Sequence, residues 1–131
     1  MSILFRDARL VDGRRCDVRT ESGSVAAVAD AVDPDPADRI VDADGRLLLP
    51  GAIDAHVHFR EPGDEHKETW ATGSRSAAAG GVTTVVDQPN TAPPTVTGAA
   101  FDRKAELATA SRVDYGVNGG VTADWDPESL F

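Results

Sequence analysis

The chain has 131 residues, of which 40% are hydrophobic and 27% are charged, so its composition predicts a folded domain rather than a disordered segment. The formal net charge of −9 argues against nucleic acid and anionic membranes as partners, because both would repel an acidic chain. Lysine occurs only at Lys67 and Lys104. Such an acidic, lysine-poor composition fits either a protein that stays hydrated in concentrated salt or an ordinary acidic cytosolic protein.

The cysteine content and the hydropathy pattern bear on location. Cys16 is the single cysteine, so no intrachain disulfide can form, which favours a reducing compartment. The N-terminus has no long apolar run, and no stretch approaches the roughly 20 apolar residues of a membrane span. We therefore expect a soluble, cytoplasmic protein.

Residues 1–49 are predicted to form short strands separated by turns. Asp12-Gly13, Ser22-Gly23 and Asp44-Gly45 supply the turn chemistry. The predicted strand cores are residues 3–5, 8–11, 25–28 and 39–41. Fewer than 50 residues of strands would be marginal as an independent domain, so we expect this segment to pack on another part of the protein.

The pattern changes after Pro50-Gly51 to an alternation of strands and helices, which predicts an α/β fold with a parallel sheet. The β-branched run over 82–87 is typical of a strand that is buried on both faces. The predicted elements are a strand over 52–59, a helix over 64–80 with Asp64 as its N-cap, the strand over 82–87, a helix capped by Thr97, and a strand over 113–117.

The last residues carry a helix-start signal, Asp126-Pro127-Glu128, with an N-cap aspartate before a proline at the first helical position. The sequence stops at Phe131, about one helical turn later. We therefore expect residues 50–131 to be the opening part of a longer fold.

His56 and His58 are separated by one residue at the predicted end of the strand over 52–59. Alternate side chains of a strand share a face, so both imidazoles should point the same way, with Cβ atoms roughly 6.6–7 Å apart. Imidazole is a ligand that suits zinc, copper, iron or nickel. The alternative is that two polar residues fell at a strand end by chance.

Polar residues also follow the other two predicted strands. Asp87 and Asn90 follow the strand over 82–87, and Asn118 follows the third strand. Ligand sites of parallel α/β folds gather at the carboxyl ends of their strands. Three polar clusters at equivalent strand ends therefore predict an active-site face there.

With their flanks, these residues resemble the amidohydrolase superfamily, and within it the dihydroorotases of the longer, bacterial–archaeal type. Residues 1–49 match only the looser pattern of the small β-sandwich that flanks the barrel in this superfamily. Phe59-Arg60-Glu61 together with Pro89-Asn90-Thr91 favours dihydroorotases over allantoinases, hydantoinases and dihydropyrimidinases. The matching stretches, within about residues 50–94, are Pro50–Gly63, Lys67-Glu68, Thr72–Arg75, Ala77–Asp87 and Pro89–Thr91.

The resemblance implies that the chain is the N-terminal portion of a (β/α)8 metal-dependent hydrolase barrel, with residues 1–49 as an incomplete β-sandwich segment and residues 50–131 as the first three strands and two helices. It implies one or two zinc ions bound by His56 and His58, and substrate contacts from His58, Arg60 and Asn90. The implied reaction interconverts dihydroorotate and N-carbamoyl-L-aspartate in pyrimidine biosynthesis. The remaining metal ligands and the general acid–base aspartate are expected beyond residue 131. The implied partners are this small-molecule substrate and, in a homo-oligomer, further copies of the protein.

Each of these assignments has an alternative. Arg60 could be a surface cation paired with Glu61, Asn90 could be a turn residue, and Asp54 is expected to support the site rather than bind the metal. Within the enzyme class the alternative is an allantoinase-like or hydantoinase-like hydrolase. In another class, the chain would be a non-catalytic remnant that associates with a subunit. Because a (β/α)8 barrel takes about 250 residues, we expect the 131-residue chain alone to be inactive.

Overall fold

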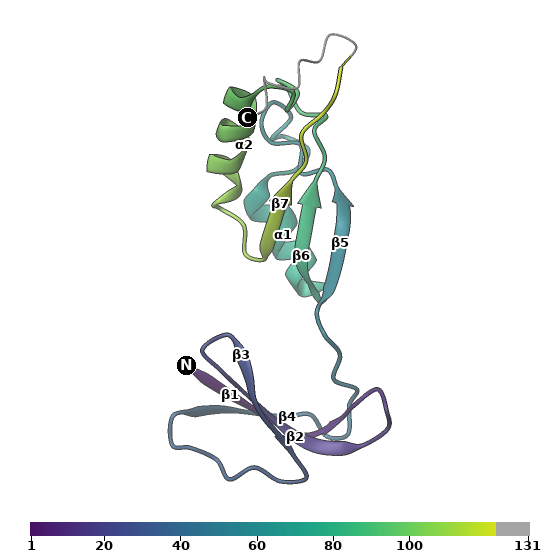
Figure 1. Cartoon of the computed structure of the whole chain (residues 1–131), viewed down its shortest axis with the longest axis vertical. Helices are drawn as coiled ribbons and strands as arrows, with labels where there is room; N and C mark the ends of the chain where they lie inside the picture. Colours follow the sequence, from purple (N-terminus) through teal and green to yellow (C-terminus); the bar gives the residue numbers. More distant parts are fainter. Residues whose placement is uncertain (123–131) are drawn as a thin grey trace. The chain divides into compact units, whose positions relative to one another are not determined.

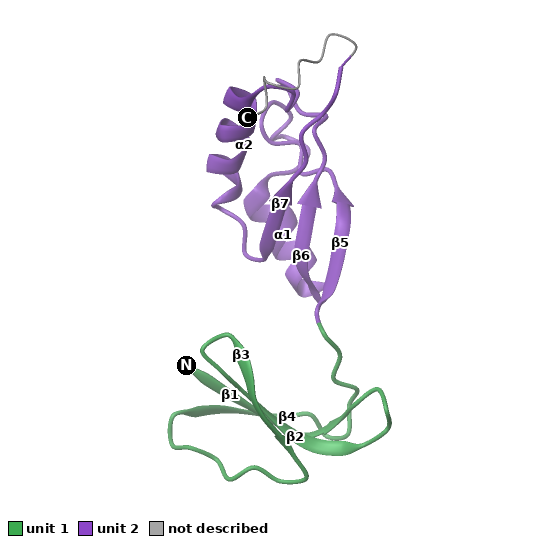
Figure 2. Cartoon of the chain, viewed as in Figure 1, with its two compact units in different colours: residues 1–50 green, residues 51–131 purple. Residues whose placement is uncertain are grey.

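The computed structural model describes residues 1–122 and contains seven strands and two helices within that range (Figure 1). The chain divides into two compact units, residues 1–50 and 51–131 (Figure 2). The helix start predicted at Asp126-Pro127-Glu128 lies outside the described residues.

Unit 1 is a four-stranded sheet in the order β3-β2-β1-β4. The strand β1 pairs antiparallel with β2 and parallel with β4, and β2 pairs antiparallel with β3. The strands are β1 (Ser2–Arg9), β2 (Arg15–Glu21), β3 (Ser24–Ala29) and β4 (Asp38–Asp42). Residues 1–50 form this one sheet, so the second layer that a sandwich needs is not made within unit 1.

The sequence interpretation missed β2 and divided β1 in two. Only Cys16 and Val18 are buried in β2, and the other residues between Arg15 and Glu21 are polar, so the strand lacks an apolar run. Its alternation nevertheless has the period of two that places Cys16 and Val18 on one face. The turn predicted at Ser22-Gly23 is confirmed: both residues have positive φ angles, 50° and 82°, as a two-residue type I′ hairpin requires.

Unit 2 is a three-stranded parallel sheet in the order β5-β6-β7, with a helix in each connection. This confirms the predicted strand–helix alternation and the parallel sheet. A hydrophobic core forms around Phe59, Trp70, Val85 and Ala108. The elements are β5 (Ala52–Val57), α1 (Trp70–Ala79), β6 (Val82–Asp87), α2 (Gly98–Ala108) and β7 (Asp114–Val117).

Burial in unit 2 differs from the expected pattern. In β6, Val85 and Asp87 are buried, whereas Thr83 on the same face is exposed; the opposite face, formed by Val82, Thr84 and Val86, is partly buried. Residues 52–56 of β5 are all exposed, and Ile53 retains 71% of its accessible surface. Both faces of β6 are therefore covered in part within residues 1–122, with Thr83 near its start as the exposed exception to the expected burial, and β5 is the more open strand.

The start of α1 is Trp70 rather than the predicted Asp64. The Thr69 side chain accepts a hydrogen bond from Thr72 N–H, and Thr72 Oγ1 accepts one from Thr69 N–H, which together make a capping box. The Glu61 carboxylate also accepts from Trp70 N–H at 2.8 Å. These acceptors satisfy the free N–H groups of the first turn, and Asp64 lies in the preceding loop. The predicted N-cap of α2, Thr97, is confirmed.

The loops after β5 and β6 pack directly on each other. Ala92 N–H donates to Pro62 O at 3.1 Å. Gly63 has a φ of +103°, and a Cβ atom there would lie 2.3 Å from Ala92 O. Only glycine combines this backbone conformation with so close an approach, so Gly63 fixes the spacing of the two loops.

None of the helices among residues 1–122 has the length and apolar character needed to cross a membrane.

We predict that Thr69→Ala lowers the free energy of unfolding by about 1 kcal/mol, because α1 loses its capping hydrogen bond. Urea denaturation of the expressed protein measures the change. The control is Ser76→Ala, on the exposed surface of the same helix, which should leave stability unchanged or slightly raised. Equal effects of the two substitutions would contradict the assigned N-cap.

We predict that Gly63→Ala destabilises the protein more than Gly81→Ala. Both glycines have positive φ angles, so both substitutions carry the backbone cost of about 1–2 kcal/mol. A Cβ atom at Gly81 would meet no other atom within 4 Å, whereas one at Gly63 would meet Ala92. Gly63→Ala therefore carries a further cost that Gly81→Ala does not, because the loops after β5 and β6 must move apart. Unfolding free energies measure the difference, and a smaller loss for Gly63→Ala would refute the loop packing.

Candidate functional site

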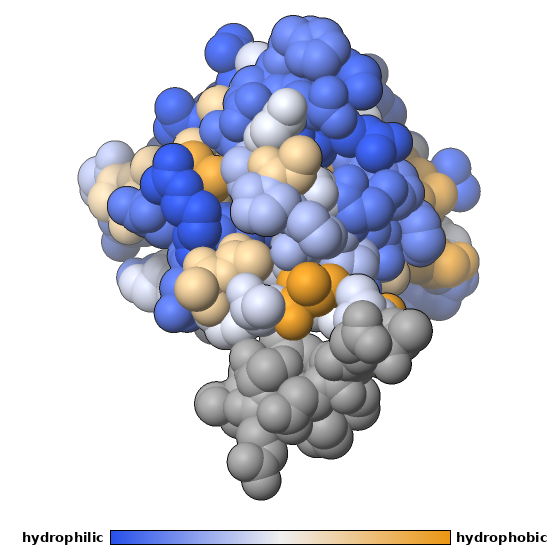
Figure 3. Space-filling model, turned by 90° about the horizontal axis from the view of Figure 1, so that it is seen from above, coloured by the Kyte–Doolittle hydropathy of each residue, from blue (hydrophilic) through white to orange (hydrophobic). Residues whose placement is uncertain are grey.

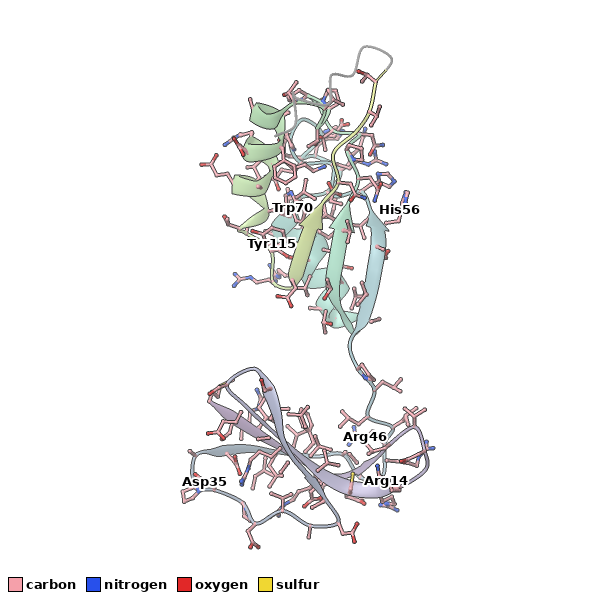
Figure 4. All side chains as sticks on the ribbon, in the orientation of Figure 1. Arg14, Asp35, Arg46, His56, Trp70 and Tyr115 are labelled. Atoms are coloured by element: carbon pink, nitrogen blue, oxygen red, sulfur yellow. The ribbon has the colours of Figure 1, made fainter. Side chains whose placement is uncertain are left out.

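The two predicted metal-binding histidines lie side by side at the carboxyl end of β5. His56 is the penultimate residue of the strand (labelled in Figure 4), and His58 directly follows the strand. Their ring centroids are 5.1 Å apart and their planes make an angle of 73°. His56 is exposed and His58 is partly buried. The arrangement brings two imidazoles to one place, as the spacing predicts.

Asp54 has a local role. Its Oδ1 atom accepts a hydrogen bond from the backbone N–H of His56 at 3.1 Å. The contact braces the end of the exposed strand β5 and involves neither imidazole ring. It agrees with the expectation that Asp54 supports the site.

Asn90 brings the loop after β6 to the ring of His58. The distance from His58 Nδ1 to Asn90 Oδ1 is 2.8 Å. An amide oxygen only accepts hydrogen bonds, so in this contact Nδ1 carries the proton and Nε2 keeps its lone pair. Metal-binding histidines are usually oriented by such a hydrogen bond to the other ring nitrogen. Asn90 was expected at the substrate, and here it contacts a candidate metal ligand.

Arg60 has a φ of +63°, an uncommon backbone conformation for a residue with a side chain. Its carbonyl oxygen accepts from Asp64 N–H at 2.9 Å, which closes the loop. The alternative pairing with Glu61 is absent, because that carboxylate is bound to the start of α1. Within residues 1–122 the Arg60 guanidinium makes no ion pair.

Two carboxylates in the loop after Arg60 are held in their ionised form. The Lys67 ammonium donates a hydrogen bond to Asp64 at 3.1 Å and lowers the pKa of that carboxyl. The backbone N–H of Gly63 donates to Glu65 at 2.8 Å and lowers the pKa of Glu65. The lowered pKa values extend the charged form of both carboxyls to more acidic pH than is usual for Asp and Glu.

The sequence interpretation missed one residue near the site, Lys104 of α2. Its ammonium is fully buried against Asp87, the last residue of β6. Phe101, Lys104 and Ala108 are spaced by three and four residues, so Lys104 lies on the same stripe of the helix as the buried Ala108. This spacing could have indicated that Lys104 lies on the buried face of the helix. It was not interpreted so because lysine is rarely buried.

The described residues bring together two candidate metal ligands but no complete metal site. Among residues 1–122 no group of three or more His, Cys, Asp or Glu side chains is placed to hold a metal ion. Catalytic zinc usually has three protein ligands. The imidazole nitrogens of His56 and His58 are suitable zinc ligands, and the ring of His58 is already oriented by Asn90. Two ligands alone make an incomplete coordination shell.

The surface of the molecule agrees with its charge. The face seen in Figure 3 is mostly hydrophilic, and its apolar atoms form separate spots rather than one continuous patch. A net charge of −9 gives the chain this character and disfavours attraction of a polyanion.

Known proteins of similar sequence cover almost all of this chain. It is 65% identical over 130 residues to a dihydroorotase of Halobacterium salinarum, which covers 98% of the chain and 30% of that protein. It is 48% identical over 112 residues to a dihydroorotase of Methanosarcina acetivorans, covering 85% of the chain and 24% of that protein. The chain therefore spans less than a third of the length of these relatives.

Solved structures show the same arrangement of elements. An L-hydantoinase (dihydropyrimidinase) from Arthrobacter aurescens matches with a TM-score of 0.83 and 32% identity, covering 93% of this chain and 28% of that one. A dihydroorotase structure matches with a TM-score of 0.64 and 26% identity, covering 90% of this chain and 31% of that one. Residues 45–130, about two thirds of the chain, match the family described as dihydro-orotase-like. The chain belongs to the dihydro-orotase-like family, as the motifs of residues 50–94 predict.

Proposed function

We propose that this chain is the N-terminal part of a zinc-dependent dihydroorotase that interconverts dihydroorotate and N-carbamoyl-L-aspartate. The observation that carries the proposal is the cluster at the carboxyl ends of β5 and β6, where His58 lies beside His56 and contacts Asn90, with Arg60 two residues after His58 in the same loop. The high identity to two proteins named dihydroorotase supports the same reaction. In this proposal β5, β6 and β7 are the first three strands of a (β/α)8 barrel, and residues 1–49 belong to a β-sandwich.

His56 and His58 would hold the zinc, together with ligands from outside residues 1–122. When bound, zinc supplies a Lewis acid for the ring amide carbonyl and lowers the pKa of a water molecule towards neutrality. Within this chain, Asn90 fixes the tautomer of His58 so that Nε2 keeps the lone pair that a ligand needs. The general acid–base aspartate is proposed to lie beyond residue 131.

Arg60 would determine the substrate specificity. Dihydroorotate carries a carboxylate on its ring, and a guanidinium binds a carboxylate through two parallel hydrogen bonds. A dihydropyrimidine or hydantoin ring without that carboxylate would gain nothing from Arg60. The arginine therefore separates the proposed activity from the alternative, a hydantoinase-like hydrolase, which the structural similarity to the L-hydantoinase favours.

The proposed partners are a small anionic substrate and, in a homo-oligomer, further copies of the protein, in the cytoplasm. The net charge of −9 disfavours nucleic acid. The second alternative, a non-catalytic remnant, differs from the first in one respect: it predicts no turnover by the protein as it is expressed from its gene.

We predict that the protein expressed from its gene opens the ring of dihydroorotate, and that Arg60→Met lowers kcat/KM about 10- to 100-fold, the range of a lost charge-assisted hydrogen bond. Slow hydrolysis of dihydrouracil, which lacks the carboxylate, should not change. The control is Arg75→Met, on the exposed side of α1, which should leave both rates unchanged. An equal loss of activity on both substrates would show that Arg60 does not bind the substrate carboxylate.

We predict that His58→Ala abolishes stoichiometric zinc binding and that Asn90→Ala weakens it about 10- to 100-fold, because the ring of His58 loses its orienting partner. Metal content after dialysis against a zinc buffer measures both effects. His66→Ala is the matched control, since 73% of the His66 side chain is exposed and it lies outside the cluster. Unchanged zinc content in His58→Ala would remove the metal assignment.

A further inference from the structure

Among residues 51–122, the most deeply buried charges are Asp87 and Lys104. Asp87 is the last residue of β6 and Lys104 lies in the middle of α2, and each retains 1% or less of its side-chain surface. The distance from Lys104 Nζ to Asp87 Oδ2 is 2.5 Å. Burying such a pair costs several kcal/mol per ion in desolvation, and apolar residues of the same size often do as well for stability. A contribution to stability does not by itself explain this buried ion pair.

Asp87 connects the ends of all three strands of the sheet. Its Oδ1 atom accepts a hydrogen bond from the backbone N–H of Phe59 at 2.7 Å, just beyond β5. Its carbonyl oxygen accepts from Asn118 N–H at 3.0 Å, just beyond β7. Its second carboxylate oxygen faces the ammonium of α2. One residue therefore joins the candidate site to both neighbouring strands and a helix.

Lys104 holds Asp87 in place. Its ammonium donates a hydrogen bond to Gln88 O at 2.5 Å, whereas its contact with Asp87 Oδ2 is an ion pair without a well-directed hydrogen bond. The ammonium thus contacts the carboxylate of one residue and the carbonyl of the next. This fixes the turn from β6 into the loop that carries Asn90.

Phe59 is the residue between His58 and Arg60, so its backbone N–H belongs to the peptide group that follows His58. Its ring packs edge-on against Trp70, with ring centroids 5.0 Å apart, and lies over Gly73, where a Cβ atom would approach it to 2.5 Å. The packing of the ring fixes the side chain of Phe59, and the hydrogen bond of its N–H group fixes its backbone. The direction of the peptide then sets where His58 and Arg60 project.

We propose that Asp87 and Lys104 are positioning residues, which hold the His58–Phe59 peptide so that the candidate metal ligand and the candidate substrate arginine keep their relative placement. The proposal rests on the proposed function for what those two residues bind. Asp87 acts by accepting the hydrogen bond of Phe59 N–H, and the contact with the Lys104 ammonium holds that buried carboxylate in place.

The test compares two double variants that both remove the buried charges. Asp87→Asn with Lys104→Met keeps an acceptor oxygen for Phe59 N–H, whereas Asp87→Leu with Lys104→Met removes it. Hydrogen–deuterium exchange of the metal-free protein measures protection of the peptide covering residues 56–63. We expect exchange there to be at least about 10-fold faster in the leucine double variant than in the asparagine one, and unchanged in β1 and β2.

The single variant Lys104→Met leaves the Asp87 charge unpaired. We expect it to speed exchange over residues 56–63 and to weaken zinc binding about 10- to 100-fold, with Asp87→Asn restoring both to within about threefold. Arg103→Met is the matched control, because Arg103 is the neighbouring cation on the same helix and its side chain is 57% exposed. It should change neither measurement.

A purely structural role gives a different pattern. The proposal is overturned if the two double variants exchange alike over residues 56–63, or if exchange rises equally throughout the chain. If Lys104→Met does not fold, the comparison of the two double variants still decides. If the unmodified protein binds no zinc, the proposed function fails, whereas the exchange measurements still show whether Asp87 and Lys104 position the peptide.

Discussion

The candidate site depends on the hydrogen bond between Phe59 N–H and the buried Asp87 carboxylate, because it joins the end of β5 to the end of β6 at the point where the polar residues gather. Parallel strands bring their carboxyl ends to one edge, but their side chains meet only if the loops that leave this edge have fixed directions. Asp87 fixes the loop after β5 and, through Lys104, the turn after β6. The contact of His58 with Asn90 follows from that geometry, since the two residues lie on these two loops.

The same loops show how a family of related reactions can share one frame. The glycine contact at Gly63 and the anchoring of α1 by Glu61 fix the backbone around Arg60 without using its side chain. The guanidinium has no ionic partner among the described residues, and in the proposed function this position is where substrate choice could change while the frame stays intact. Similarity of fold to an L-hydantoinase, beside high sequence identity to dihydroorotases, is the expected result of such an arrangement.

Sequence reasoning succeeded where the signal was local. The turn at Ser22-Gly23, the cap at Thr97 and the β-branched strand over 82–87 each follow from the residues themselves, and the structure confirms them. It failed where contacts distant in sequence decide. The strand β2 is polar on one face and takes its place from pairing with β1 and β3. The start of α1 differs, because its Thr69–Thr72 capping box is a local signal that was overlooked, to which Glu61 adds a contact from the preceding loop. Buried Lys104 was missed because its partner, Asp87, lies on another element.

The sequence by itself determined the α/β class, the family, and the two histidines whose spacing places them on one face of a strand, because periodicity and motif are properties of neighbouring residues. Only the tertiary structure decided that Asn90 contacts the ring of His58, that Arg60 has no ionic partner among residues 1–122, and that the buried pair of Asp87 and Lys104 binds the backbone after His58. These contacts join residues on different elements. Their geometry depends on how the strands and helices pack, which no local pattern encodes.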